Sequence, residues 1–388
     1  MSELQVKDTR YIAGTYGRFP VEIVSGKGSL YKDTDGKKYI DMGTGIGVNA
    51  FGVCDKKWVS AVKKQLKKVQ HTSNLYYTNP CADLAEKLCL KTGLKKVFFS
   101  NSGAEANECA IKVARKYGKE HKGEEYFNII TLKNSFHGRT ITTLSATGQD
   151  VFHKDFQPLT DGFLYADAND CEGLIKLVSE NKACAIMIEC VQGEGGVNVL
   201  DKNFVLTAYE LCQKNDMLLI IDEVQTGNGR TGKLYAYMHY GILPDVVTTA
   251  KGLGGGLPIG ACMIGEKAEF TLGKSDHGST FGGNPVCSAG AISVIDRLTE
   301  EFLAEVTRKS KLIITTLENA KGIKSVSGMG LMLGVETEKP ASEVVKECIK
   351  KGVLCLTAKT KVRLLPALNI SDKQLKKALE VIKSVCAE

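Results

Sequence analysis

Long apolar runs are missing from this chain of 388 residues. Its longest apolar stretches, such as MLLII, are far too short to span a bilayer. The first ten residues, MSELQVKDTR, are charged and have no apolar centre, so they do not resemble a secretion signal. We therefore expect a cytoplasmic protein that has no membrane partner.

Closely spaced cysteine pairs are also missing. The 13 cysteines are scattered, and none of them forms a CxxC motif. An odd number of cysteines without such spacing predicts reduced thiols in the cytosol rather than a disulfide framework. We expect no metal site.

Arginine is scarce, since only eight of the 51 basic residues are Arg. Arg binds carboxylates and phosphates in a bidentate manner better than Lys, so the few Arg residues are candidates for such binding. The densest lysine stretch, KKWVSAVKKQLKKVQ, carries apolar residues at helical spacing, and we interpret its lysines as a solvated helix face. No stacking aromatic residues alternate with these bases, so we expect no nucleic-acid partner.

Strand and helix patterns alternate after Lys57. KVFFS, FNIITL, ACAIMIE, MLLIID, DVVTTA and GACMIG predict strands, and SGAEANECAIKVARKYG predicts a helix. This alternation predicts an α/β fold in which helices cover a mostly parallel sheet. After Pro285, two long helical stretches (286–298 and 301–320) and the strands LMLGVE and VRLLP predict a smaller α+β unit.

We therefore expect a large domain at 57–285. The smaller domain would combine an N-terminal part, 1–56, with a C-terminal part, 286–388. Its last helices are expected to begin near Ala341 and Ser371.

Three unusual features follow predicted strands, where ligands of open parallel sheets bind. SNSGAEAN opens a helix with free backbone N–H groups that suit a phosphate. Asp222 ends an apolar strand, where a carboxylate needs a cationic partner. Lys251 stands among small residues, and an enclosed amine there could have a lowered pKa and act as a nucleophile. Each feature alone has a structural alternative: a capped helix, a buried ion pair, or a lysine that reaches water.

One cofactor would use all three features. Pyridoxal phosphate has a phosphate, a pyridine nitrogen that needs a carboxylate partner, and an aldehyde that condenses with lysine. Asp222 and Lys251 would then address opposite ends of one small molecule.

The order and spacing of several motifs resemble the class III pyridoxal-phosphate aminotransferases. These motifs are SNSGAEAN, SFHGRT, IECVQGEGG, IIDEVQTGNGRTGKL, AKGLGGGLPIGA, HGSTFGGNP and VRLLP. Within that family, FHGRTITTLSATGQ and HTSNLYYTNP resemble the acetylornithine aminotransferase branch most. The resemblance implies a fold type I transferase and a homodimer with shared active sites. It also implies transfer of the distal amine of N2-acetyl-L-ornithine to 2-oxoglutarate, in arginine biosynthesis.

The resemblance also implies roles for individual residues. Lys251 and Asp222 would be catalytic, and Glu189 would pair with Arg363 and release it. The expected cofactor-binding residues are Ser102, Gly103, Ala104, Phe136, Asp222, Glu223, Val224, Gln225, Lys251 and Thr280. The expected substrate-binding residues are Tyr16, Arg139, Glu189, Ser279 and Arg363.

Alternatives remain open at this level. Ornithine, succinylornithine, succinyldiaminopimelate or 4-aminobutyrate could be the donor instead. The same cofactor on this fold also serves racemases, mutases and decarboxylases, although two spare arginines favour transfer between two carboxylate substrates. A lysine-rich protein without catalysis would leave the apolar setting of Asp222 and Lys251 unexplained.

Overall fold

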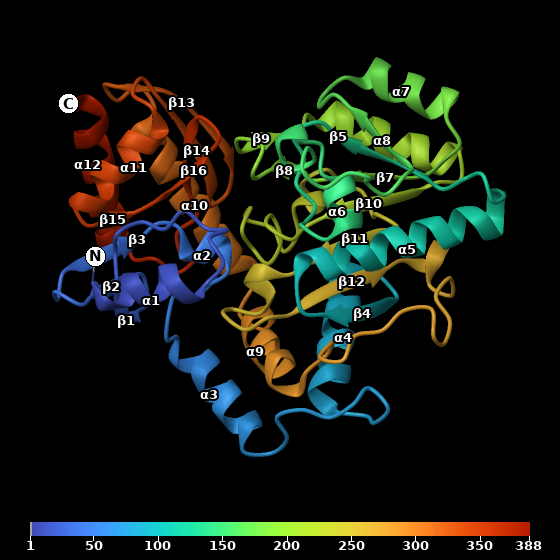
Figure 1. The fold of residues 1–388 in the computed structure, drawn as a ribbon, viewed down its shortest axis with the longest axis horizontal. Helices are drawn as coiled ribbons and strands as arrows, with labels where there is room; N and C mark the ends of the chain where they lie inside the picture. The colour runs from blue at the N-terminus through green and yellow to red at the C-terminus, as the bar shows by residue number, and fades with distance from the viewer. Residues whose placement is uncertain (1) are drawn as a thin grey trace.

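A computed structural model describes residues 2–388 and shows two lobes (Figure 1). The larger lobe is built on one seven-stranded sheet with the strand order β4-β12-β11-β10-β7-β5-β6. The bounds of these strands are β4 Lys96–Ser100, β5 Asn128–Leu132, β6 Phe163–Ala166, β7 Ala183–Ile188, β10 Leu218–Asp222, β11 Val246–Thr249 and β12 Gly260–Ile264.

The sheet is mostly parallel, as predicted. The exception is β12, which pairs antiparallel with both β4 and β11. The connection from β11 to β12 contains only the short 3-10 turn Lys251–Leu253 rather than a crossover helix. Since parallel neighbours need a long crossover, this connection returns the chain in the opposite direction.

Helices cover both faces of the sheet, and the strands are therefore apolar on both sides. In β10, Leu218 and Ile220 pack in the cluster formed with α5 (Gly103–Lys122), whereas Leu219 and Ile221 pack in the cluster that contains α8 (Lys202–Lys214). Because side chains alternate along a strand, Asp222 falls on the same face as Ile220, toward α5. This alternation sets the direction of the acid that was predicted to be functional.

The smaller lobe contains a second, antiparallel sheet, ordered β13-β14-β17-β16. Its strands are β13 Ile323–Met329, β14 Met332–Thr337, β16 Leu356–Ala358 and β17 Lys361–Leu364, and its helices are α10 Glu300–Leu317, α11 Ala341–Lys350 and α12 Asp372–Ala387. The smaller α+β unit predicted from the sequence is confirmed.

N-terminal and C-terminal segments of the chain both contribute to this lobe (Figure 1). The N-terminal strands β1 (Ile23–Lys27), β2 (Leu30–Asp33) and β3 (Lys38–Asp41) form a sheet that β15 (Val353–Leu354) completes by pairing parallel with β3. N-terminal and C-terminal segments thus share one sheet, although the domain limits at 57 and 285 stay a prediction.

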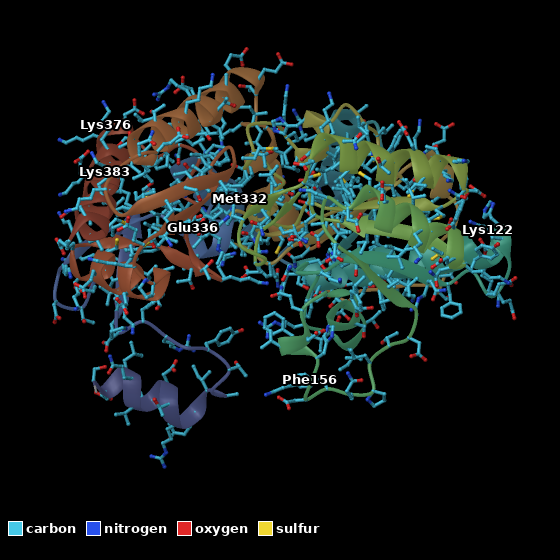
Figure 2. The ribbon with its side chains drawn as sticks, turned by 90° about the horizontal axis from the view of Figure 1, so that it is seen from above. Lys122, Phe156, Met332, Glu336, Lys376 and Lys383 are labelled. Carbon is cyan, nitrogen blue, oxygen red and sulfur yellow. The ribbon has the colours of Figure 1, made fainter. Side chains whose placement is uncertain are left out.

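The remaining helices surround these sheets, and α1 stands apart from the body of the molecule (Figure 2). No side chain of α1 is buried. Within residues 2–388, no helix is both long and apolar enough to cross a membrane. The other bounds are α1 Glu3–Tyr11, α2 Thr44–Gly47, α3 Lys56–Leu66, α4 Asn79–Thr92, α6 Ile141–Ala146, α7 Cys171–Glu180, α9 Pro285–Ile295, β8 Val191–Gln192 and β9 Asn198–Val199.

Candidate active site

A cavity of about 490 Å³ lies at the carboxyl ends of five strands of the large sheet: β4, β5, β7, β10 and β11. This is the edge at which parallel α/β sheets bind ligands. The cavity brings together ten of the residues singled out in the sequence: Ser102, Gly103, Ala104, Phe136, Arg139, Glu189, Asp222, Val224, Gln225 and Lys251.

The N-terminus of α5 forms one wall of the cavity. Ser102 caps the helix, because its hydroxyl accepts a hydrogen bond from the backbone N–H of Glu105 at 3.2 Å. The next residue, Gly103, packs so closely on Val224 that a Cβ atom would lie 2.5 Å from Val224 Cγ1. Only glycine fits there, and the helix thus presents free backbone N–H groups and a positive dipole end to the cavity.

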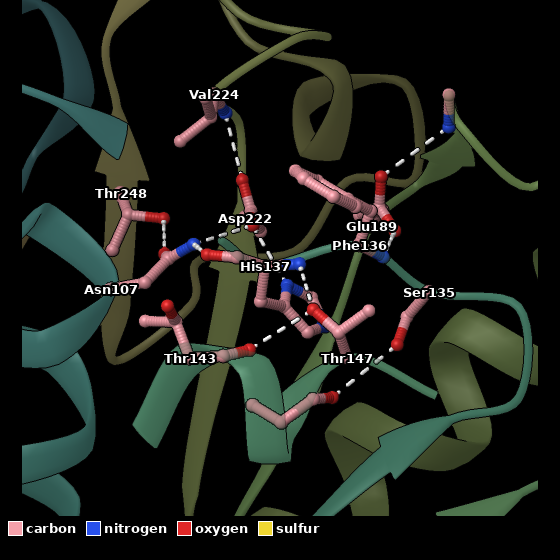
Figure 3. A network of polar contacts seen from close by, with 12 residues as sticks. Asn107, Ser135, Phe136, His137, Thr143, Thr147, Glu189, Asp222, Val224 and Thr248 are labelled. Atoms are coloured by element: carbon pink, nitrogen blue, oxygen red, sulfur yellow. Dashed lines mark hydrogen bonds and ion pairs between the residues drawn. The ribbon is translucent and has the colours of Figure 1, made fainter. Parts of the chain in front are cut away.

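Asp222 is fixed by three hydrogen bonds (Figure 3). Its Oδ1 accepts from the backbone N–H of Val224 at 2.9 Å, and its Oδ2 accepts from Asn107 Nδ2 at 2.8 Å. The third contact joins Oδ2 to His137 Nδ1 at 2.8 Å, and since a carboxylate only accepts, the imidazole is the donor. Asn107 is itself oriented by Thr248, whose hydroxyl donates to Asn107 Oδ1 at 2.6 Å. The carboxylate therefore has one fixed orientation at the cavity wall.

His137 is buried behind Asp222. Burial by itself lowers the pKa of His137, but the hydrogen bond to Asp222 and the charge of that carboxylate outweigh burial and leave the pKa raised. The contact with Asp222 therefore favours the protonated form of the His137 imidazole.

Glu189 is the second buried acid of the cavity. Its two carboxylate oxygens accept hydrogen bonds from the backbone N–H groups of Phe136 at 2.9 Å and Gly193 at 3.3 Å. Burial raises the pKa of Glu189, against the opposing influence of the charge on His137. The carboxylate is therefore occupied with holding the loop that carries Phe136.

Lys251 lies two residues after the end of β11 and lines the cavity. Its backbone has φ of +44°, in the left-handed region, which costs a non-glycine residue on the order of 1 kcal/mol or more. Such strain is typical of functional positions. Burial lowers the pKa of Lys251, although the charge of Asp222 acts in the opposite direction. A larger share of the amine is thus unprotonated, and nucleophilic, near neutral pH than for an exposed lysine.

Arg363 is buried on β17 and reaches the cavity through Gln225, whose Oε1 accepts from Arg363 Nη1 at 3.2 Å. Its ion pair is with Glu194, at 2.5 Å from Nη1, rather than with Glu189. Glu189, the expected partner of Arg363, instead accepts from backbone amides with its two oxygens. The Glu194 side chain is 30% exposed, whereas that of Arg363 is 4% exposed, so the acid is the more accessible partner.

Arg139 lines the cavity, but unlike Arg363 it is exposed, and among residues 2–388 no acid pairs with it. Aromatic rings flank its guanidinium instead: Cζ lies 4.3 Å from the ring centroid of Phe152 and 5.5 Å from that of Phe136. Its donors remain available to a ligand.

Five expected residues do not line the cavity. The side chain of Glu223 points away and accepts from the Thr226 hydroxyl and the Tyr237 backbone, and Arg363 approaches only through Gln225. Tyr16 is 74% exposed beside α1, and Ser279 and Thr280 line a separate hollow with Asn74 and His71. Within one chain, these last three residues lie outside the cavity lining, although the Ser279 hydroxyl accepts from Nδ2 of Asn101, which lines the cavity, at 3.2 Å.

The sequence interpretation missed three residues of the site: Asn107, His137 and Glu194. Each lies inside a motif that was noticed, namely SNSGAEAN, SFHGRT and IECVQGEGG. Asn107 and His137 are polar residues at otherwise apolar positions, a signal that was available. The pairing of Glu194 depends on the turn between β8 and β9, which the sequence does not specify.

Comparison with known proteins agrees with this geometry. The family model for class III aminotransferases matches residues 11–386. The chain belongs to the class III aminotransferases. An acetylornithine aminotransferase from Haemophilus ducreyi is 51% identical, over 100% of both chains. The crystal structure of N-acetylornithine aminotransferase from Stenotrophomonas maltophilia is similar with a TM-score of 0.85 and 34% identity, and covers 98% of each chain. An ornithine aminotransferase from Toxoplasma gondii has a TM-score of 0.94 and 30% identity, and the match covers 99% of this chain and 94% of that one.

Class III aminotransferases are enzymes that depend on pyridoxal phosphate. The residues of this aminotransferase fit the cofactor. A helix N-terminus that tolerates no side chain at Gly103 suits the phosphate, oriented Asp222 suits the ring nitrogen, and the enclosed amine of Lys251 suits the aldehyde. Phe136 lines the cavity and offers an aromatic ring to the cofactor.

Proposed function

We propose that this aminotransferase moves the distal amine of N2-acetyl-L-ornithine to 2-oxoglutarate. The products would be N-acetylglutamate 5-semialdehyde and glutamate, and the setting would be arginine biosynthesis in the cytoplasm. The relatives named acetylornithine aminotransferase, at 51% and 45% identity over nearly the full chain, support this donor. The observation that carries the proposal is that two arginines in different states serve the cavity of Lys251. Arg139 has no acidic partner among the described residues, whereas Arg363 is paired with Glu194.

The residues divide the work between them. Bound pyridoxal phosphate supplies the aldehyde that takes up amines and a ring that stabilises negative charge on the adjacent carbon. Asp222, held by Asn107 and His137, would keep a proton on the ring nitrogen. Lys251 Nζ, once free, would remove a proton from the donor carbon that bears the amine, acting as a general base. The lowered pKa of Lys251 suits this role.

The two arginines would serve different carboxylates. Arg139, whose N–H groups are free, would bind the carboxylate that lies far from the reacting carbon in both N-acetylornithine and glutamate. N-acetylornithine has no carboxylate beside its reacting carbon, so Arg363 would stay paired with Glu194 and would not be left as an unpaired buried charge. Glutamate has such a carboxylate, and it would displace Glu194 from Arg363. Glu194 thus takes the gating part that the sequence interpretation had given to Glu189.

The site would be completed by a second copy of the chain. The segment that contains Leu75 and Tyr77 is strongly exposed, at 87% and 106%, and Asn74 Nδ2 donates to the carbonyl oxygen of Ser279 at 3.1 Å. Phe281 is 56% exposed in the same region. An exposed apolar cluster of this kind is typical of an interaction surface. In a homodimer it would bring Ser279 and Thr280 to the cavity of the partner.

A donor screen tests the function. The purified holoenzyme would be supplied with 2-oxoglutarate and one amine at a time, and glutamate formation followed. We expect N-acetylornithine to have the highest kcat/KM, above ornithine, succinylornithine, succinyldiaminopimelate and 4-aminobutyrate. A clear preference for one of the latter four would replace the proposed donor, and glutamate formation from none of them would refute the transfer.

A further inference from the structure

We propose that Phe152 is a positioning residue that sets carboxylate specificity by holding the guanidinium of Arg139 in place. This inference rests on the proposed function, because it assumes that Arg139 binds the distal carboxylate of the donor. Phe152 lies outside the cavity lining and touches the site through Arg139 and Phe136.

Arg139 needs something to hold it. A long, exposed arginine loses considerable side-chain entropy when it adopts one orientation, and that loss weakens binding unless the side chain is fixed beforehand. An acid could fix it, but an acid would occupy its N–H donors and cancel its charge. No acid within residues 2–388 does so, and the ring of Phe152 lies 4.3 Å from its Cζ.

An aromatic ring fixes the group in another way. A guanidinium over a ring face is attracted by the ring electrons, while the N–H groups at its edge stay free. The rings of Phe152 and Phe136 lie nearly perpendicular, at 80°, with centroids 6.0 Å apart. Together they form a two-sided support from which the guanidinium edge can receive a carboxylate.

The support itself is anchored. Phe152 ends the 3-10 turn Asp150–Phe152. Two buried polar residues flank this turn: Gln149 precedes it and His153 follows it. Gln149 Nε2 donates to the carbonyl oxygen of Ser135 at 2.9 Å, and His153 Nε2 lies 2.9 Å from the carbonyl oxygen of Leu144. These hydrogen bonds hold the turn in place, and the turn therefore fixes the position of the Phe152 ring.

Phe152 would affect the binding of the amine donor rather than the chemical step. Phe152 is not within the cavity, and the reacting atoms belong at Lys251, at the far end of the donor from the distal carboxylate. Loss of the ring should therefore raise KM for donors that carry this carboxylate and leave kcat unchanged.

The test compares two donors that differ only in the carboxylate: N-acetylornithine and N-acetylputrescine. We expect Phe152→Leu to raise the half-saturating concentration of N-acetylornithine roughly two- to fivefold, the effect of losing one cation–π contact at an exposed arginine. The value for N-acetylputrescine should stay unchanged, as should kcat for both donors. Phe152→Tyr keeps the ring face and should restore the behaviour of the unmodified enzyme.

Arg139→Gln serves as the reference variant. It should remove the discrimination between the two donors, and Phe152→Leu should have no further effect in that background. The inference is overturned if Phe152→Leu weakens both donors equally, which indicates a structural defect, or weakens neither. If Arg139→Gln keeps the full discrimination between the two donors, the proposed role of Arg139 is wrong and the inference falls with it. Retained discrimination in Phe152→Leu together with its loss in Arg139→Gln overturns the inference alone.

Discussion

At the residue scale, the chemistry depends on charges whose partners are fixed by neighbouring side chains. Asp222 is the clearest case, since Asn107 and His137 hold one oxygen and the Val224 backbone holds the other. An acid in this position is committed to one direction before any ligand arrives. Preorganised charges of this kind stabilise transition states because little reorganisation is needed.

Replacing Asp222 by Asn should keep the cofactor bound but slow turnover roughly a hundredfold, or about 3 kcal/mol in the barrier. An amide has nearly the same shape, but it cannot hold a proton on the ring nitrogen. The measurement is kcat alongside the amount of cofactor that stays bound after gel filtration. A variant with nearly normal kcat would show that Asp222 only stabilises the fold.

Arg363 and Glu194 should affect the two half-reactions differently. Arg363→Ala should cripple the half-reaction with glutamate or 2-oxoglutarate and spare that with N-acetylornithine, because only the former has a carboxylate beside the reacting carbon. Glu194→Gln should improve the use of glutamate relative to N-acetylornithine, since the arginine is then released from its acid. Single-turnover absorbance with each substrate separately measures both effects. Equal losses in both half-reactions for Arg363→Ala would refute the gate.

At the scale of elements, the site exists because five strands end at one edge and the helix α5 begins there. Gly103 is the tightest point of that junction. Its missing side chain lets α5 approach the loop after β10 through the contact with Val224.

Gly103→Ala should therefore shift the start of α5 and weaken cofactor binding. Overpacking of this kind usually costs 1–3 kcal/mol, so we expect a rise of about tenfold in the dissociation constant of pyridoxal phosphate and a lower Tm. Val224→Ala in the same chain should recover much of both losses, because it removes the two methyl groups that the new Cβ meets. Unchanged cofactor affinity in Gly103→Ala would show that the close packing has no part in the phosphate site.

Much of this arrangement could be predicted from the sequence. The strands of the large sheet are short apolar runs, and β4, β5, β7, β10, β11 and β12 all form where such runs occur. Their alternation with helices was sufficient to predict a mostly parallel sheet. The antiparallel direction of β12 was not predicted, because it follows from the length and path of a loop and leaves no mark on the strand itself.

Side-chain pairing across the site was harder to predict. Arg363 comes from β17 and Glu194 from the loop after β8, and nothing local in either segment names the other. Glu189 lies next to the same loop and was the expected partner of Arg363. In the structure, its carboxylate accepts from the backbone amides of Phe136 and Gly193 instead. Sequence reasoning identified the residue types at the site but not which acid meets which base.

At the scale of the whole molecule, a single chain leaves the expected Ser279 and Thr280 outside the cavity lining and the apolar segment at Tyr77 uncovered. Both features have one explanation if two chains associate. The homodimer would then be a condition for cofactor retention as well as for stability.

Tyr77→Glu should weaken the proposed dimer, because it places a charge in a surface that is otherwise apolar. We expect sedimentation to show monomers at concentrations where the unmodified protein is dimeric, and faster loss of cofactor on dialysis. Ile175→Glu, at a 47% exposed position on α7, is the matched control and should leave assembly unchanged. A dimer of normal strength in Tyr77→Glu would place the interface elsewhere.

The central claim is that Lys251 is the amine that joins the cofactor, in a cavity built for its phosphate and ring nitrogen. The most direct measurement is borohydride reduction of the holoenzyme, followed by digestion and mass spectrometry of the peptides. We predict one stoichiometric pyridoxyl modification, at Lys251, and loss of that modification together with turnover in Lys251→Ala. Modification at a different lysine, or substantial turnover by Lys251→Ala without added amines, would contradict the account.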